Sequence, residues 1–181
     1  LPVIISGTVT DASGRALKFT VVDTLLRIDL AAALASGGAV TVKIDFTLPM
    51  PETRVVGGRS GYECFTKPDQ DGNCIFLGAQ WFPRAAVYSD YEGWHNKAFV
   101  GGGEFTLEFG DYDVAITVPA DFAVSSTGDL VNATEILSLA QQERMAKARA
   151  SYRDPVYIVT PQEAAAAEKA KAAATKTWRF K

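Results

Sequence analysis

The stretch that decides the fold is residues 104–127, with the sequence EFTLEFGDYDVAITVPADFAVSST. It contains three predicted strands separated by turns at Gly110 and Pro119, and the strands are 104–109, 112–118 and 122–127. Regularly spaced short strands of this kind predict antiparallel sheets, arranged as a β-sandwich or as a curved, saddle-shaped pair of sheets.

The residues before this stretch also read as strands. Residues 39–48 alternate apolar and polar side chains, which is typical of a half-buried strand, and Pro49 then ends the run. Residues 52–73 are rich in Gly, Pro, Asp and Arg and predict a long surface excursion, after which 75–82 returns as a strand. The first 82 residues therefore extend the β prediction rather than change it.

Two peripheral helices are predicted near the C-terminal end. Asn132 and Glu135 have capping-box spacing before an apolar stripe, which predicts a helix over about 133–152. Thr160 and Glu163 repeat the spacing, with Pro at the first helical position, and predict a second helix over 161–174. Short strands are expected between and after them, at 156–159 and 177–180. The predicted fold class is mainly β, with these two helices as additions.

The length and charge limit the class of protein. A chain of 181 residues fits a single β domain spanning 1–181. Its net charge of −3 gives no reason to expect a nucleic-acid partner, and no apolar run approaches the about 20 residues of a transmembrane segment. The chain starts without Met and ends directly after a strand-like segment, so we expect a fragment of a longer protein. Export to the periplasm and a cytoplasmic location both remain open.

Cys64 and Cys74 are the only cysteines, and they flank a loop rich in turn-forming residues. If the flanks pair as a hairpin, the two sulfur atoms could form a disulfide, which implies an oxidising compartment. A tight turn centred on Asp71 and Gly72 would instead place Cys74 opposite Asp69 and far from Cys64. The sequence leaves both arrangements open. Two thiolates alone cannot complete a tetrahedral shell, so a zinc site here is not expected.

Catalytic groups are sparse in this sequence. His95 is the single histidine, and beside Trp94 in a loop it is interpreted as a surface or interface residue rather than a general base. Paired carboxylates or a calcium site are conceivable, but solvated turns and strand edges are the favoured interpretation of the acids. These acids are Asp90, Glu92, Glu104, Glu108, Asp111 and Asp113. We therefore assign no catalytic and no metal-binding residue to the chain.

Gln80 is the candidate binding residue. It lies at the end of a predicted strand, next to Trp81 and Phe82, and its neutral amide can both donate and accept hydrogen bonds. It could bind the polar end of a ligand against an aromatic wall. The alternative is an ordinary exposed polar residue, which the pattern alone favours.

Four segments carry a resemblance to a known family, and they are 79–84 (AQWFPR), 88–94 (YSDYEGW), 103–114 (GEFTLEFGDYDV) and 116–119 (ITVP). They look like the amino-terminal β domain of bacterial zinc aminopeptidases of the gluzincin family, which includes aminopeptidase N and leukotriene hydrolase. The resemblance is close over 74–130, where 125–130 fits the family's pattern of a final strand and a turn. It is looser elsewhere, and 176–180 looks like the last strand before the family's catalytic domain.

The resemblance implies a saddle-shaped β domain that packs on a thermolysin-like catalytic domain. That second domain binds zinc through His-Glu-x-x-His, and the full enzyme uses the zinc to activate water and to hydrolyse peptides from their N-terminus. Neither this motif nor the family's Gly-x-Met-Glu-Asn loop occurs here. The chain alone is therefore expected to be inactive and without a cofactor, with its own catalytic domain and a peptide substrate as partners.

The family's β domain lends one Glu or Gln to the active site, where it helps to hold the substrate's free α-amine. Gln80, followed by Arg84 and Asp90, matches that position best. Two alternatives stay open beside this interpretation. One is a stand-alone β-sandwich binding or scaffold module with a ligand on Trp81 and Trp94, and the other is a small hydrolase that uses the acidic residues.

Overall fold

The computed structural model describes residues 7–57, 59–65, 72–98, 102 and 106–181. It divides into two compact units, unit 1 over Leu1–Phe109 and unit 2 over Gly110–Lys181. Strands account for 28% of the residues and helices for 18%, so the fold is mainly β, as the sequence predicts. In the described part of the chain the sheets do not close into a sandwich.

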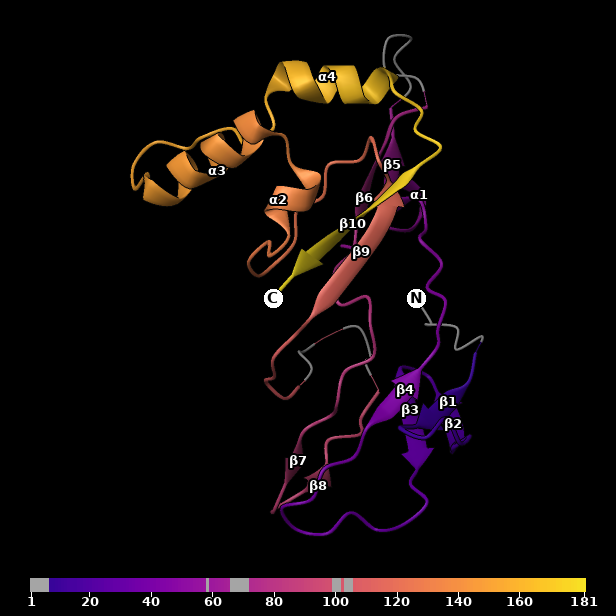
Figure 1. Cartoon of the computed structure of the whole chain (residues 1–181). Coiled ribbons are helices and arrows are strands. Elements are labelled where there is room, and N and C mark those ends of the chain that lie inside the picture. Colours follow the sequence, from indigo (N-terminus) through magenta and orange to yellow (C-terminus); the bar gives the residue numbers. More distant parts are fainter. Residues whose placement is uncertain (1–6, 58, 66–71, 99–101, 103–105) are drawn as a thin grey trace. The chain divides into compact units, whose positions relative to one another are not determined.

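The described residues of unit 1 form four antiparallel strand pairs and one short helix (Figure 1). Its elements are β1 Val9–Asp11, β2 Lys18–Val22, β3 Leu25–Asp29, β4 Val42–Ile44, α1 Thr53–Val56, β5 Gly61–Cys64, β6 Cys74–Leu77, β7 Tyr88–Ser89 and β8 Gly93–Trp94. β1 pairs with β4, β2 with β3, β5 with β6 and β7 with β8. Val9 and Leu17 are the buried apolar side chains among its described residues.

Unit 2 is built on one long-range strand pair. Its elements are β9 Val114–Pro119, α2 Ala133–Ile136, α3 Leu139–Ala150, α4 Pro161–Lys169 and β10 Thr175–Phe180. β9 and β10 run antiparallel (Figure 1). Their register places Trp178 opposite Ile116. The buried core consists of Leu137, Trp178 and Phe180. Partly buried apolar residues pack against this core, and they are Val114, Ile116, Val118, Val124, Leu130, Ala133, Ile136, Met145 and Ile158.

Several predicted strands differ from the structure. The strand predicted over 39–48 is reduced to β4, and the strand predicted over 75–82 ends at Leu77 in β6. Of the predicted strand 104–109 the structure describes 106–109, where Leu107 makes an isolated bridge to Ala86. Residues 122–127 and 156–159 are not strands. Their apolar side chains Val124 and Ile158 pack on the core of unit 2, whereas the partner of β9 is β10, about sixty residues further along the chain. Apolar alternation in these two segments therefore reflects burial without strand pairing.

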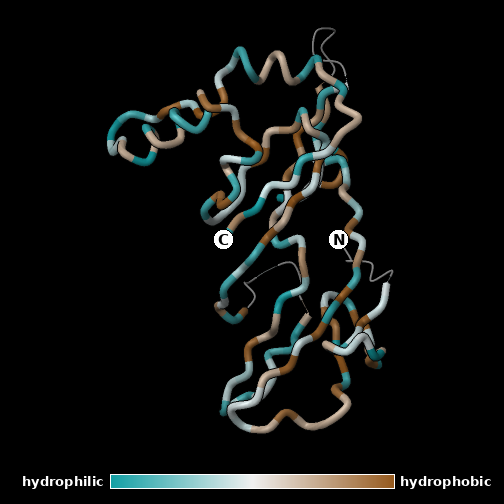
Figure 2. The backbone as a smooth tube through the Cα atoms, in the orientation of Figure 1, coloured by the Kyte–Doolittle hydropathy of each residue, from teal (hydrophilic) through white to brown (hydrophobic). Residues whose placement is uncertain are grey.

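The single helix predicted over 133–152 is two helices. Leu137 is buried in the core, and Ser138 has extended backbone angles, φ −64° and ψ 159°. The Ser138 side chain accepts from the Gln141 N–H, and the Gln141 side chain bonds the Ser138 N–H in return, so a capping box starts α3 there. α3 has no buried residue, and Figure 2 shows hydrophilic stretches along it.

The predicted capping box of Thr160 and Glu163 is confirmed, but that of Asn132 and Glu135 is wrong. Asn132 makes no side-chain bond to the helix backbone. Its amide instead donates to the Thr177 carbonyl over 2.9 Å, and its oxygen accepts from the Arg179 N–H over 3.0 Å. Asn132 is therefore a buried connection between α2 and β10.

Helix α4 is tied to α3 by a second polar connection. Arg144 Nη2 lies 2.6 Å from both carboxylate oxygens of Glu163, and the Thr160 N–H donates to Glu163 Oε2 over 2.8 Å. The hydrogen bond from Arg144, followed by that from Thr160, lowers the pKa of Glu163 from 4.5 to about 2. Arg144 Nε also donates to the Ile158 carbonyl, so one guanidinium joins α3, the connecting segment and α4.

We predict that α4 loses protection from hydrogen exchange as the pH falls from 4.5 towards about 2. The folded pKa lies below the unfolded one, so the stabilisation is complete above pH 4.5 and is lost as Glu163 becomes protonated. Amide exchange of α4 measured across this range tests the prediction. Glu163→Gln should abolish the transition, while Glu168→Gln, at an exposed position of the same helix, should keep it. An unchanged transition in Glu163→Gln would contradict the assignment.

Candidate functional site

The β5–β6 hairpin carries the segment that contains Gln80. Its register places Gly61 opposite Leu77 and Cys64 opposite Cys74. The two cysteines form a disulfide with their Cα atoms 4.0 Å apart. Of the two arrangements that the sequence leaves open, the structure therefore shows the paired one. Residues 66–71, which include most of the turn, lie outside the described residues.

Ser60 closes the other end of this hairpin. Its Oγ donates to the Ala79 carbonyl over 2.7 Å and accepts from the Ala79 N–H over 2.8 Å. We call these two hydrogen bonds the Ser60 bridge. It fixes both polar groups of the backbone at Ala79, the residue directly before Gln80. Ser60 was not predicted from the sequence, because no local pattern links a serine to a backbone group 19 residues away.

Gln80 adopts a left-handed backbone conformation with φ 52°. This region costs a residue with a side chain about 1–2 kcal/mol, so surrounding contacts must hold it. The Ser60 bridge provides one such contact. Trp81 provides another, because its ring lies over Gly78, where an added Cβ would come within 3.3 Å of Trp81 Cδ1. Residues 78–81, the Gln80 turn, therefore bend tightly and leave the Gln80 side chain exposed.

The side chains after Gln80 form an aromatic cluster. Trp81 and Phe82 meet edge to face with ring centroids 5.3 Å apart, and Phe46 approaches Trp81 at 6.4 Å. Trp81 and Phe82 are half-buried, so their rings give the turn a rigid apolar flank. The amide of Gln80 has no hydrogen-bond partner within the described segments. An exposed amide with free donors and an acceptor beside aromatic rings can bind a small polar group.

Arg84 and Asp90 accompany Gln80 in the resemblance, but across the described residues neither side chain bonds to it. Arg84 Nη2 donates to the Glu108 carbonyl over 3.3 Å. Together with the bridge between Ala86 and Leu107, this bond connects the segment after the Gln80 turn to residues 107–108. Asp90 is exposed at the turn between β7 and β8. The role of Arg84 is thus local support of the chain.

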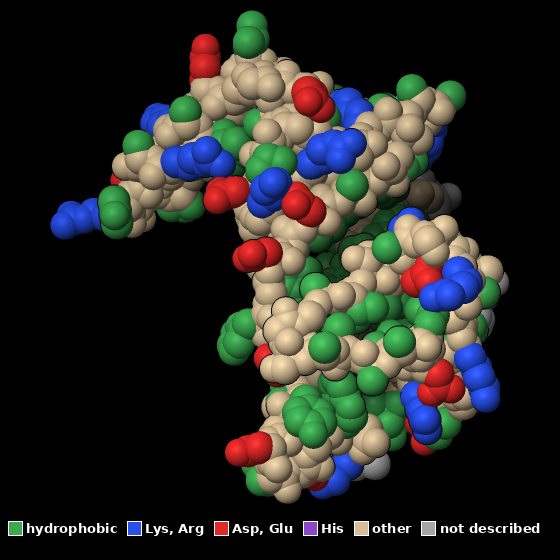
Figure 3. Space-filling model, turned by 60° about the horizontal axis from the view of Figure 1, so that its bottom comes forward, with side chains coloured by type: hydrophobic (Ala, Val, Ile, Leu, Met, Phe, Trp, Pro, Cys, Tyr) green, Lys and Arg blue, Asp and Glu red, His purple; other side chains and the backbone are tan. Residues whose placement is uncertain are grey.

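The β7–β8 hairpin presents aromatic side chains to solvent. Tyr88 and Trp94 face each other across the pair with ring centroids 5.3 Å apart, and both are about 60% exposed. Tyr91 in the turn is 80% exposed. Figure 3 shows how hydrophobic side chains reach the surface between charged ones. Exposed aromatic groups at one hairpin mark a candidate interaction surface.

His95 is fixed inside this hairpin by polar contacts. Ser89 Oγ lies 2.9 Å from His95 Nε2, and Glu92 Oε2 lies 4.0 Å from the same nitrogen. A catalytic triad needs the carboxylate on the opposite ring nitrogen, where it orients the base. Since hydroxyl and carboxylate approach one nitrogen here, the described residues form no triad. His95 instead supports the turn of the hairpin.

Lys97 completes this polar group. Its Nζ lies 2.6 Å from Glu92 Oε1. The hydrogen bond from Lys97 lowers the pKa of Glu92, and the same bond raises the pKa of Lys97. Both groups are therefore charged at neutral pH, as expected for a surface ion pair rather than for a general acid or base.

The acidic residues considered for catalysis or metal binding do not form a site in the described structure. Glu104, one of the acids considered for catalysis, lies outside the described residues, and Asp113 pairs with Lys181 at 3.5 Å. Within the described segments, no three His, Cys, Asp or Glu side chains lie close enough together to hold a metal ion.

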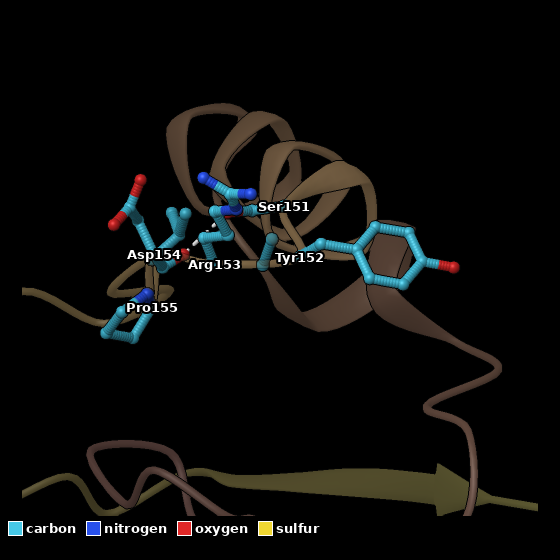
Figure 4. Close-up of a pocket in the computed structure, with 7 residues that line it drawn as sticks. Ser151, Tyr152, Arg153, Asp154 and Pro155 are labelled. Atoms are coloured by element: carbon cyan, nitrogen blue, oxygen red, sulfur yellow. Dashed lines mark hydrogen bonds between the residues drawn. The ribbon is translucent and has the colours of Figure 1, made fainter.

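Unit 2 has an open hollow of about 440 Å³ after α3, lined by Ala148 and residues 151–156. In Figure 4, Tyr152 points away from the other labelled side chains. Ser151 Oγ donates to the Asp154 carbonyl over 2.6 Å, so its hydroxyl proton is used locally.

The comparisons with known proteins add no assignment. No family model, no curated protein and no solved structure matches this chain. Over the residues that the structure describes, no helix is long and apolar enough to cross a membrane.

Proposed function

We propose that the chain is the amino-terminal β domain of a zinc aminopeptidase, and that Gln80 helps to bind the free α-amine of the peptide substrate. The observation that carries this proposal is the geometry of Gln80. An exposed amide is held at φ 52° between the Ser60 bridge and Trp81, at the position that the family resemblance marks. Strained backbone of this kind is concentrated at ligand-binding sites.

The chemistry of an amide suits an ammonium group. The Gln80 carbonyl oxygen can accept one of the three N–H bonds of a protonated N-terminus. Such a hydrogen bond to a charged group contributes about 1.5–3 kcal/mol. Fixing the amine also fixes the first peptide bond at a constant distance from it, and this positioning favours removal of a single residue.

The described residues of this chain offer no zinc site, because both cysteines are joined in a disulfide and the acids are dispersed. In the proposed enzyme the zinc and the catalytic groups belong to a separate catalytic domain, as the family resemblance implies. The exposed aromatic side chains Tyr88, Tyr91 and Trp94 are the proposed contact surface for that domain. If the catalytic domain covers the β7–β8 hairpin, the hairpin can carry exposed aromatic side chains at the centre of the interface and charged side chains at its rim.

Gln80→Ala tests the proposal in the protein that joins this chain to a His-Glu-x-x-His domain. We expect the KM for leucine p-nitroanilide to rise about tenfold with kcat within about threefold, because a bond made equally in the ground and transition states is lost. Gln162→Ala, at an exposed glutamine of unit 2, is the matched control and should leave both constants unchanged. Equal kinetics for Gln80→Ala and the wild type would remove Gln80 from the site.

Gln80→Gly separates the side chain from the shape of the turn. Glycine adopts positive φ without the penalty, so unfolding in urea should show stability unchanged or raised by up to about 1 kcal/mol. The KM should nevertheless rise as far as in Gln80→Ala. If Gln80→Gly bound substrate normally, the turn and not the amide would be the important element.

A stand-alone binding module is the second candidate, and the exposure of Trp94 favours it. The two functions predict different coding sequences downstream of this chain in its gene. A reading frame that continues into His-Glu-x-x-His supports the aminopeptidase, and a stop codon after Lys181 contradicts it. Peptidase activity of the isolated chain that survives a chelator would contradict both candidates and support the small hydrolase.

A further inference from the structure

The β5–β6 hairpin is a small element whose second strand, β6, is largely exposed. It is a two-stranded sheet with four cross-strand pairs. The three residues Ile75, Phe76 and Leu77 are each about half exposed, so β6 is not anchored in a core. Isolated two-stranded hairpins are marginally stable in water. The disulfide between Cys64 and Cys74 is therefore a major constraint on this element.

The side chains around the hairpin provide limited support. Tyr62 and Phe76 pair across the strands with ring centroids 5.9 Å apart. Arg54 Nη2 lies 2.6 Å from Glu63 Oε1, but both side chains are about half exposed, where ion pairs contribute little. Residues 51–53 also hold the outer edge of β5, where the Tyr62 N–H donates to the Pro51 carbonyl over 2.8 Å and Thr53 Oγ1 donates to the Tyr62 carbonyl over 3.3 Å. These bonds fix β5 and not β6, so none of them replaces a covalent link between the strands.

The hairpin connects the disulfide directly to the Gln80 turn. Cys64 and Cys74 close one end, and Ser60 and Ala79 are joined just beyond the other end. The Ser60 bridge forms only while β5 and β6 stay in register, because Ser60 precedes β5 and Ala79 follows β6. Loss of register would release the backbone of Ala79 and with it the left-handed conformation of Gln80.

We propose that the redox state of the Cys64–Cys74 pair regulates amine binding by Gln80, through the register of β5–β6 and the Ser60 bridge. A dithiol delivers two electrons and two protons to the S–S bond, which breaks to give two thiols, and the dithiol itself becomes a disulfide. Cys64 and Cys74 are both partly exposed in the structure. This proposal rests on the proposed function for the identity of the ligand.

Hydrogen exchange of the full 181-residue chain tests the coupling without any assay of activity. Treatment with dithiothreitol should speed exchange of the Ala79 N–H about tenfold or more, because removal of a cross-link lowers the local cost of opening. The Arg179 N–H is the matched control, since it also donates to a side-chain oxygen, that of Asn132 in unit 2. Its exchange should not change.

The variants make the test specific. The double variant Cys64→Ser, Cys74→Ser should exchange like the reduced chain and should not respond to the dithiol. Ser60→Ala should already exchange fast at Ala79 and show little further change on reduction, whereas Ser60→Thr, which keeps the hydroxyl, should behave like the wild type. Unchanged exchange at Ala79, or equal acceleration at Ala79 and Arg179, would overturn the proposal.

Kinetics of the zinc-bearing protein test the link to the ligand. The double serine variant should raise the KM for a free-amine substrate about fivefold or more, and it should add little when Gln80→Ala is already present. An additive rise in the combined variant would overturn the regulation through Gln80. If Gln80→Ala alone changes nothing, the proposed function fails, and the exchange of Ala79 still decides whether the disulfide controls the turn.

Discussion

Trp178→Ala is expected to lower the free energy of unfolding of unit 2 by about 3–5 kcal/mol, the range for loss of a large aromatic side chain from a core. Trp178 is 5% exposed and packs with Leu137 and Phe180, which together form the buried core of this unit. It also lies within β10, opposite Ile116 of β9. The cavity would therefore open beside the strand pair on which the unit is built.

Urea unfolding followed by circular dichroism measures this loss, and hydrogen exchange in β9 locates it. Trp94→Ala, at a position 60% exposed, is the control and should cost less than about 1 kcal/mol. Trp178→Phe should cost less than Trp178→Ala, since phenylalanine leaves a smaller cavity. Both variants also remove the buried indole Nε1, which has no partner among the described residues. A cost below about 1 kcal/mol for Trp178→Ala would contradict the assignment of the core.

Asn132→Asp is expected to destabilise unit 2 by about 3 kcal/mol at neutral pH, because it buries a charge without a partner. Asn132 is 5% exposed, and its Nδ2 donates to the Thr177 carbonyl and to Glu135 Oε2. The new carboxylate could still accept from the Arg179 N–H. Its second oxygen would face a carbonyl and another carboxylate, which are both acceptors.

The cost of Asn132→Asp should fall as the pH is lowered. Burial and the neighbouring carboxylate raise the pKa of the new acid, and its protonated form can donate to Thr177. Urea unfolding at pH 5 and pH 8 measures the difference. Asn96→Asp, at an exposed position, should be neutral at both pH values. Equal costs for the two variants would show that Asn132 does not connect α2 to β10 as described.

Local signals in this sequence predicted local structure. The capping box of Thr160 and Glu163 is confirmed because both partners lie within one helical turn. The same spacing at Asn132 gave a wrong prediction, since its partner at Thr177 is 45 residues away and the sequence does not show that distance. The mainly β class followed from alternation, but the pairing of β9 with β10 did not.

At the candidate site, too, the sequence indicates local features but not contacts between residues that are far apart in the chain. The aromatic neighbours of Gln80 are visible in the sequence, but the strand predicted over 75–82 ends at Leu77, so Gln80 lies in a turn and not at a strand end. Its left-handed backbone and the Ser60 bridge are not visible there, because both depend on a serine 20 residues earlier that meets Ala79 only through the register of β5–β6. The sequence does not decide the disulfide for the same reason, because only the strand register places Cys64 opposite Cys74.

The most direct test of the central claim is a binding cycle between Gln80 and the substrate's amine. Inhibition constants of leucine amide and of its analogue without the α-amino group are measured for the zinc-bearing wild type and for Gln80→Ala. We predict that loss of the amine weakens binding about tenfold more in the wild type than in the variant, a coupling of about 1.4 kcal/mol. The same weakening in both proteins would contradict the proposed role of Gln80.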